Sequence, residues 1–175
     1  MIRPMRVISG FLMALVFAAV VATVTADSPT TVQVRDDCDP ATFNAGPPDG
    51  PGLGHICDGD GGTTFGEFIG ELQATQRAEK WRFNPDRMSE PRNILAQNRG
   101  GETHSFTRVA QFGGGQVDVL NTLSGNPVPA PECLQPSVGP TFIGPGHSLA
   151  VNDVAGGDKF QCCIHPWMRT TVRKR

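Results

Sequence analysis

Residues 160–168 read FQCCIHPWM, and this short segment carries more information than any other part of the chain. Three side chains that can bind a soft metal, Cys162, His165 and Met168, follow one another at a spacing of three. A chain that leaves a strand and turns tightly can bring every third residue toward one point. Thiolate, imidazole and thioether suit copper, and a trigonal site of one Cys and two His with a long axial Met is a known electron-transfer geometry. The segment therefore predicts a copper site at the end of a strand.

The two adjacent cysteines cannot both face this site, because successive side chains of a strand point to opposite faces. The spacing to the following His and Met selects Cys162 as the ligand, so that Cys163 points away. The trigonal geometry needs a second His from elsewhere. His104 is the best candidate, since it begins a predicted strand just after a turn. The other two, His55 and His147, lie in loops rich in Gly and Pro and are expected at the surface.

From residue 81 onward the chain has the pattern of a β-protein. Gly and Pro account for 21 and 15 of the 175 residues, so long helices cannot fill the chain. The predicted strands, each bounded by turn residues, are 81–83, 94–97, 105–109, 148–151, 159–163 and 170–172. Residues 110–140 read as one long loop. Short strands joined by turns favour a β-sandwich.

The motif Cys162-x-x-His165-x-x-Met168, followed by a short final strand, resembles the copper-binding loop of the cupredoxins, the blue copper proteins. It is most similar to the plastocyanin and amicyanin type. The upstream His of that family follows a turn like residues 98–104, which begin with Asn and end with the candidate His. The similarity covers about residues 81–175 and is strong at the two motifs.

The resemblance implies an all-β fold, a Greek-key β-sandwich holding one copper ion that alternates between Cu(I) and Cu(II). It assigns four ligands to the metal: His104, Cys162, His165 and Met168. Relatives transfer electrons through the exposed edge of the His in the final loop. By this resemblance His165 would provide that edge, and Pro166 and Trp167 would form the docking surface.

The chain departs from the family pattern in several places. Thr170 stands where many relatives have Gly, and Ser105 stands where many have Asn. The loop 110–140 is longer than in a minimal cupredoxin, and Cys163 adds a thiol beside the expected ligand. These departures bear on the redox potential and the partner surface more than on copper binding.

Five cysteines are an odd number for an exported protein. With one of them bound to the metal, we expect two bridges, Cys38 with Cys57 and Cys133 with Cys163. Four cysteines allow three pairings, so the other two stay open. A disulfide between the adjacent Cys162 and Cys163 is a further alternative.

Residues 1–26 have the pattern of a secretory signal peptide. Arg3 and Arg6 precede an apolar run over residues 7–24, and residues 24–26, Val-Thr-Ala, place small residues where a signal peptidase reads them. An uncleaved anchor is the alternative, because the run is close to the minimum length of a membrane span. We expect an exported protein, periplasmic or extracellular, in which disulfides persist.

Residues 27–80 are expected to form an N-terminal extension of loops and one helix, ahead of the cupredoxin-like domain at 81–175. Residues 27–35 read as a flexible lead. Thr64 and Glu67 form the pattern of a capping box, which predicts a helix over about 64–80. Its apolar face comprises Phe65, Phe68, Ile69 and Leu72.

The sequence predicts an electron carrier rather than an enzyme, because no group offers an open coordination position beside a general base. The formal net charge is −2, and −4 without residues 1–26, which hold two Arg and no acid. Nucleic-acid-binding proteins usually carry a basic footprint, so we expect no nucleic-acid partner. An electron carrier implies a redox partner protein, whose identity the sequence does not give. We expect a monomer with no membrane span after cleavage. The alternatives are a copper storage or delivery protein with the same ligands, and an exported interaction domain without a redox role.

Overall fold

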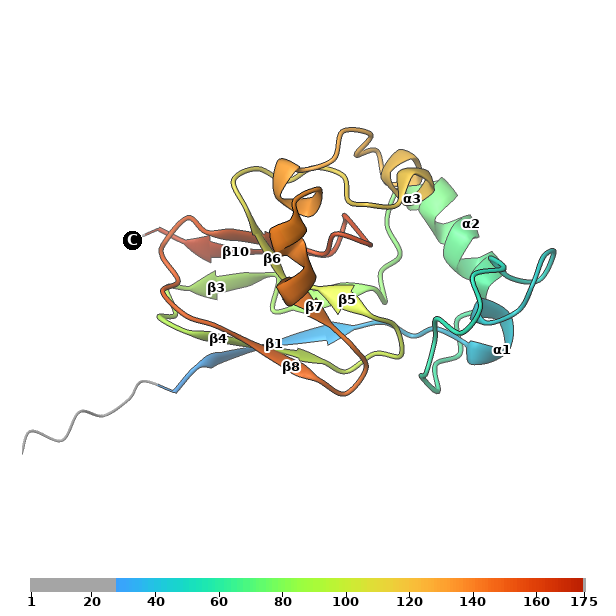
Figure 1. The fold of residues 1–175 in the computed structure, drawn as a ribbon, viewed down its shortest axis with the longest axis horizontal. Helices are drawn as coiled ribbons and strands as arrows, with labels where there is room; N and C mark the ends of the chain where they lie inside the picture. Colours follow the sequence, from blue (N-terminus) through green and yellow to red (C-terminus); the bar gives the residue numbers. More distant parts are fainter. Residues whose placement is uncertain (1–27, 175) are drawn as a thin grey trace, which may run out of the picture.

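The computed structural model describes residues 28–174, which form two four-stranded sheets (Figure 1). The first sheet has the order β2-β1-β4-β8 and comprises Arg82–Asn84 (β2), Thr30–Arg35 (β1), Ile94–Asn98 (β4) and Ser148–Val151 (β8). The second has the order β3-β10-β9-β6 and comprises Arg87–Ser89 (β3), Arg169–Arg173 (β10), Lys159–Gln161 (β9) and Thr107–Val109 (β6). A separate antiparallel pair comprises His104–Ser105 (β5) and Phe142–Ile143 (β7). The predicted β-rich fold is confirmed, whereas the Greek-key connection stays a prediction.

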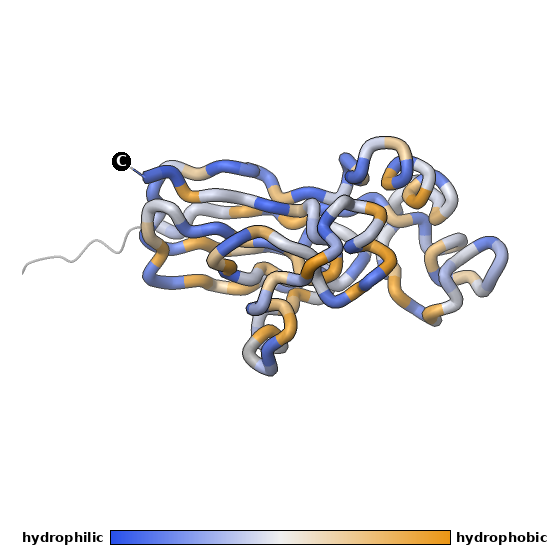
Figure 2. Tube along the Cα trace, turned by 90° about the horizontal axis from the view of Figure 1, so that it is seen from above, coloured by the Kyte–Doolittle hydropathy of each residue, from blue (hydrophilic) through white to orange (hydrophobic). Residues whose placement is uncertain are grey.

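An apolar core lies between the two sheets. Val32 of β1 is buried there, and its neighbours along the strand are more exposed. The ring of Phe83 in β2 lies 5.1 Å from that of Phe106, which in turn stacks on Phe160 of β9 at 4.5 Å. Figure 2 shows the resulting alternation of hydrophobic and hydrophilic residues along the strands. Each fully buried large apolar side chain contributes about 1.5–3 kcal/mol, so these contacts hold the sheets together.

The strand β1 corrects the prediction of a flexible lead at 27–35. It pairs antiparallel with β2 and parallel with β4, and is therefore an interior strand of its sheet. The segment TTVQVR at 30–35 alternates apolar and polar residues, as a half-buried strand requires. The sandwich thus takes a strand from the N-terminal side of the predicted boundary at residue 81.

The extension between β1 and β2 contains two helices, α1 (Pro40–Phe43) and α2 (Phe65–Thr75). The capping box at the start of α2 is confirmed, because Thr64 and Glu67 bond to each other's backbone N–H. The helix ends earlier than predicted, where Gln76 adopts a left-handed conformation and its N–H bonds to the carbonyl of Leu72. Phe43 and Phe68 both pack against Trp81, so the extension docks on the sandwich through an aromatic cluster.

The segment predicted as a loop at 110–140 contains short helices instead. They are α3 (Asp118–Leu123) and the 3-10 turns η1 (Pro131–Cys133) and η2 (Pro136–Thr141). Asn121 stabilises the segment because its side chain bonds to both the N–H and the carbonyl of Gly115. These local bonds explain why a stretch rich in Gly and Pro is ordered.

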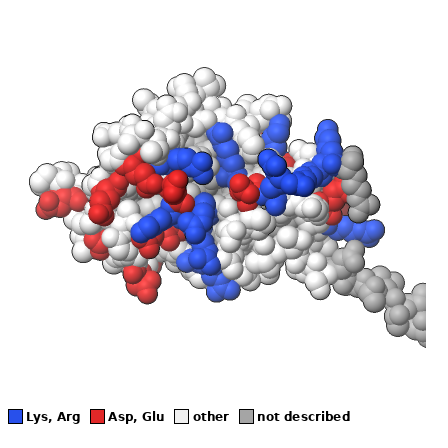
Figure 3. Space-filling view, turned by 180° about the vertical axis from the view of Figure 1, so that it is seen from behind, with Lys and Arg blue, Asp and Glu red and all other residues white. Residues whose placement is uncertain are grey.

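The predicted signal peptide at 1–26 lies outside the described residues. Within residues 28–174, no helix has the length and apolar character needed to cross a membrane. Figure 3 shows Asp and Glu side chains gathered toward the end of the molecule that carries the extension, and Lys and Arg mostly over the rest of that face.

Candidate metal centre

Three potential metal ligands meet at one end of the sandwich: His104 of β5, Cys162 just after β9, and His165 in the loop that follows. The sulfur of Cys162 lies 3.8 Å from Nδ1 of each histidine, and the two Nδ1 atoms are 3.2 Å apart. All three residues are buried. The structure thus brings together two residues separated by 58 positions, as the sequence predicted, in a group that can hold a metal ion.

The size of this donor triangle fits a single ion. For sides of 3.8, 3.8 and 3.2 Å, the point equidistant from the three atoms lies about 2.1 Å from each. Metal-to-nitrogen bonds in proteins are about 2.0–2.1 Å and bonds from a metal to thiolate sulfur are about 2.3 Å, taking zinc as the reference. One ion can therefore reach all three donors with little rearrangement.

The loop that presents Cys162 and His165 is closed by backbone bonds. Gln161 of β9 pairs with Arg169 of β10, which fixes the two ends of the loop. Inside the loop, the N–H of Cys162 donates to the carbonyl of Met168 at 3.0 Å. The N–H of Met168 in turn donates to the carbonyl of His165 at 2.9 Å. This tight turn is what places residues three apart around one point.

The sulfur of Cys162 is surrounded by hydrogen-bond donors. The backbone N–H groups of Ser105, Ile164 and His165 each lie 3.4 Å from it. Burial raises the pKa of this thiol, but the imidazoles of His104 and His165 outweigh burial and hold the pKa well below its usual 9.0. The site is thus built for a thiolate, which is the form that binds metals.

Asp36, just after β1, orients His104 from behind. Nε2 of His104 lies 2.7 Å from Oδ2 of Asp36, and both side chains are almost completely buried. Since Nδ1 faces the other ligands, Nε2 carries the hydrogen and donates it. Burial lowers the pKa of His104, but Asp36 and the Cys162 thiolate raise it to about 10. A carboxylate in this position fixes the ring and increases its basicity as a ligand.

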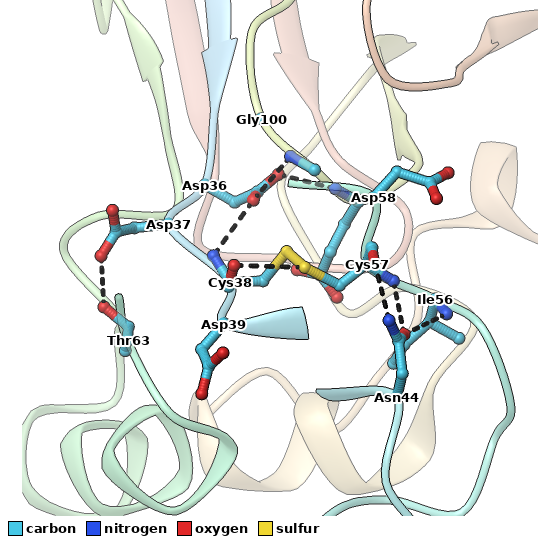
Figure 4. The surroundings of a disulfide bond; sticks show 12 residues. Asp36, Asp37, Cys38, Asp39, Asn44, Ile56, Cys57, Asp58, Thr63 and Gly100 are labelled. Atoms are coloured by element: carbon cyan, nitrogen blue, oxygen red, sulfur yellow. Dashed lines mark hydrogen bonds between the residues drawn. A yellow bond between two sulfur atoms is a disulfide. The ribbon is translucent and has the colours of Figure 1, made fainter. Parts of the chain in front are cut away.

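The backbone around Asp36 is shaped to receive its carboxylate. Its oxygens accept the N–H groups of Gly101 and Glu102 at 2.9 and 3.1 Å. Burial raises the pKa of Asp36, but the bond from His104 and these backbone bonds together lower it to about 2. A Cβ at Gly100 would lie 1.8 Å from Oδ2, so only glycine permits this approach. Figure 4 shows Asp36 directed toward this turn and Asp37 directed away, toward Thr63.

Glu102 stands in the corresponding place beside His165. Its Oε2 lies 3.6 Å from Nε2 of His165 and accepts a hydrogen bond from the indole of Trp81. Neither carboxylate was predicted from the sequence. For Glu102 the signal was only its place two residues before His104, because it lies outside β5. For Asp36 there was none, since its partner is 68 residues away.

Met168 is 1% exposed and lies in the same core cluster as Cys162. Its backbone helps close the ligand loop, as described above. The coordination of a metal by its thioether stays a prediction.

The predicted exposed edge of His165 is absent, which corrects that part of the sequence analysis. His165 is 2% exposed. The ring of Phe68 from α2 covers it at 6.3 Å, and that of Trp167 packs against it at 5.4 Å. Pro166 is buried as well, and Trp167 is only half-buried. Of these two rings, Phe68 comes from the extension, which lies outside residues 81–175.

The predicted disulfides are confirmed. Cys38 bonds to Cys57, and Cys133 bonds to Cys163, which leaves Cys162 as the free thiol. The alternative of a bridge between adjacent cysteines is therefore wrong. Two disulfides are typical of exported proteins.

The surface positions expected for the two remaining histidines are also confirmed. His55 and His147 are exposed, and His55 pairs locally with Asp58.

Comparison of the chain with family models, with curated proteins and with solved structures finds no match. The interpretation of the site therefore rests on its own geometry and chemistry.

Proposed function

We propose that this protein is an exported copper protein that carries single electrons. One copper ion would be held by His104, Cys162 and His165, with Met168 as a weak axial ligand. The observation that carries the proposal is the buried triangle of one thiolate and two imidazole nitrogens, sized for one ion. Export is supported by the signal-like residues 1–26 and the two disulfides.

The chemistry of the donors favours copper over other metals. Thiolate and thioether are soft ligands, and a trigonal set of two His and one Cys with an axial Met is the arrangement of blue-copper sites. Structural zinc sites in proteins are usually closed by four strong protein donors, and here a fourth strong donor does not accompany the triangle among the described residues. When bound, copper supplies one-electron exchange between Cu(I) and Cu(II).

The protein's own residues keep the donor set fixed. Asp36 holds the ring of His104, and three backbone N–H groups hold the Cys162 sulfur. Phe68 and Trp167 cover His165 and exclude water from that side. A site that is already arranged and dry needs little reorganisation on electron transfer. With Met168 as the axial ligand, the site would have no open position for a substrate, so we propose no catalytic turnover at the metal.

The route to a redox partner protein would run through Trp167 rather than directly from His165. The indole ring packs edge-on against the imidazole of His165, and its N–H donates to the carbonyl of Ala78 at 3.2 Å. Trp167 is half-buried, whereas His165 and Pro166 are buried, so its exposed part would be a contact point for a docked partner. Docking would therefore centre on Trp167.

Burial of His165 also supports a second candidate, a copper storage or delivery protein that uses the same ligands. The two candidates differ in the oxidation state they hold. A carrier stabilises both Cu(I) and Cu(II), whereas a storage protein binds Cu(I) alone and stays colourless.

The test is a copper titration of the purified protein, followed by its visible spectrum. The proposal predicts one copper per chain and an intense visible band from thiolate-to-copper charge transfer, lost in Cys162→Ala and retained in the control His147→Ala. A colourless protein that binds only Cu(I) would favour storage. Absence of copper uptake would refute both.

A further inference from the structure

A pocket of about 500 Å³ opens above the metal centre, between the extension and α3. Its walls are apolar and include Phe65, Phe68 and Ile69 of α2. Leu53 and Val119 line it from opposite elements and are 71% and 60% exposed. Pockets of 300–1,000 Å³ with apolar walls and a few polar groups are the usual form of small-molecule sites. The size and lining of this pocket therefore match a small organic ligand.

Two polar side chains with complementary hydrogen-bonding character line this pocket. His165 and Glu102 are both among its lining residues. With a metal on Nδ1, Nε2 of His165 carries a hydrogen, yet it makes no hydrogen bond within residues 28–174. Oε2 of Glu102 is 3.6 Å away from it, beyond hydrogen-bond range. The side chain of His165 is 3% exposed and lines the pocket, so this N–H is available to a ligand bound there.

A hydroxyl group satisfies both residues at once, because it accepts one hydrogen bond and donates another. It can accept the N–H of His165 and donate to the carboxylate of Glu102. An anion fits poorly, since the carboxylate of Glu102, which lines the pocket, would repel it. The apolar walls select a ligand whose remaining surface is apolar, and the phenylalanine rings favour an aromatic one.

We propose that this pocket binds a small neutral aromatic alcohol of the phenol class. Its ring lies against Phe65 and Phe68 and its hydroxyl lies between His165 and Glu102. The bound molecule would contact His165, a proposed metal ligand. The inference rests on the proposed function, because a metal on Nδ1 is what places the hydrogen of His165 on Nε2. It identifies the chemistry of a ligand that would bind where His165 lines the pocket.

The test uses the zinc-loaded protein, in which the metal cannot oxidise the probe. The probes are 4-methylphenol and its isostere 1,4-dimethylbenzene, which lacks the hydroxyl. Binding is followed by NMR shifts of the His165 ring and the Ile164 methyl groups during titration. A charge-assisted hydrogen bond to a buried group should make the phenol bind about tenfold or more tightly than the isostere. Glu102→Gln should remove most of this preference and leave the affinity for 1,4-dimethylbenzene unchanged.

A matched pair of surface variants controls for nonspecific apolar binding. Leu53→Ser changes the pocket rim, and Leu134→Ser changes a leucine of similar exposure, 63%, outside the pocket. Leu53→Ser should weaken binding of both probes several-fold, and Leu134→Ser should not. No shift of His165, equal affinity for the two probes, or equal effects of the two serine variants would overturn the proposal.

Failure of the pocket and failure of the metal site are distinguishable on the same preparation. A blue copper-loaded protein that binds neither probe would refute the proposed ligand site and support the proposed metal centre. A protein that binds neither zinc nor copper would refute the metal centre. The proposed hydrogen bond from His165 to the hydroxyl of the ligand would then be refuted as well, because it depends on a metal bound to Nδ1.

Discussion

Replacing Asp36 by Asn tests whether the buried carboxylate behind His104 is part of the metal centre. The substitution keeps the size and one acceptor oxygen but removes the negative charge that faces Nε2 of His104 at 2.7 Å. The backbone bonds from Gly101 and Glu102 can partly persist, so the fold should survive. The main loss is the orientation and basicity of the His104 ligand.

The expected loss follows from the position of the carboxylate. Partners that hydrogen-bond to metal-bound His typically contribute tenfold to a hundredfold to metal affinity, or about 1.4–2.8 kcal/mol. Asp36 is almost fully buried and bonds directly to the ligand, so Asp36→Asn should fall within that range. The assay is a competition titration of Cu(I) against a chelator of known affinity.

Asp37→Asn provides the control, because the neighbouring carboxylate points the other way (Figure 4). Asp37 bonds to Lys80 at 2.5 Å and to Thr63 at 2.7 Å, on a half-exposed surface away from the ligands. Exposed ion pairs contribute about 0–1 kcal/mol to stability, so copper affinity should stay within about twofold of the wild type. Wild-type affinity in Asp36→Asn, or equal losses in the two variants, would refute the reasoning.

Four further outcomes are expected. Met168→Leu should still take up copper but raise the reduction potential, measured by voltammetry, because the axial thioether is lost; a buried Met-to-Leu exchange should cost less than about 1.5 kcal/mol in urea unfolding. Replacing Cys38 and Cys57 together by Ala should lower the unfolding free energy by about 3 kcal/mol, as expected for the 19-residue loop they close. The visible spectrum of the copper-loaded protein should remain; its loss would mean that the extension shapes the arrangement of the ligands. Phe68→Ala should cost about 3–5 kcal/mol and speed reduction of the copper by a small hydrophilic reductant in stopped-flow measurements, whereas an unchanged rate would show that the ring does not shield His165. In the metal-free protein, the pKa of Asp36 is lowered from the ordinary 3.8 to about 2, so the carboxylate contributes about 2 kcal/mol to stability above pH 3.8 and loses this contribution as the pH falls through 2. The difference in unfolding free energy between wild type and Asp36→Asn should therefore shrink over that pH range. A constant difference would contradict the assignment.

The local parts of the site followed from the sequence because they depend on short-range geometry. The alternation expected of a strand over 159–163 separated Cys162 from Cys163. In the structure β9 ends at Gln161, yet one cysteine still lies in the donor triangle and the other in the bridge to Cys133. The capping box at Thr64 was predicted for the same reason, since its two hydrogen bonds span three residues.

Other elements depended on contacts between distant segments and were missed. The strand β1 has a clear alternating pattern, but its role became visible only in its pairing with β2 and β4. The pairing of Asp36 with His104 and the packing of Phe68 over His165 join residues far apart in the chain. Periodicity carries no information on which distant surfaces meet, so the burial of His165 could not be predicted from it.

The central claim, that one copper ion is held by Cys162, His104 and His165, is tested most directly by X-ray absorption spectroscopy at the copper edge. The measurement is made on the copper-loaded protein in both oxidation states. The account predicts one short copper–sulfur bond and two copper–nitrogen bonds, nearly unchanged on reduction. A coordination shell without sulfur, or one that gains or loses a strong ligand on reduction, would contradict it.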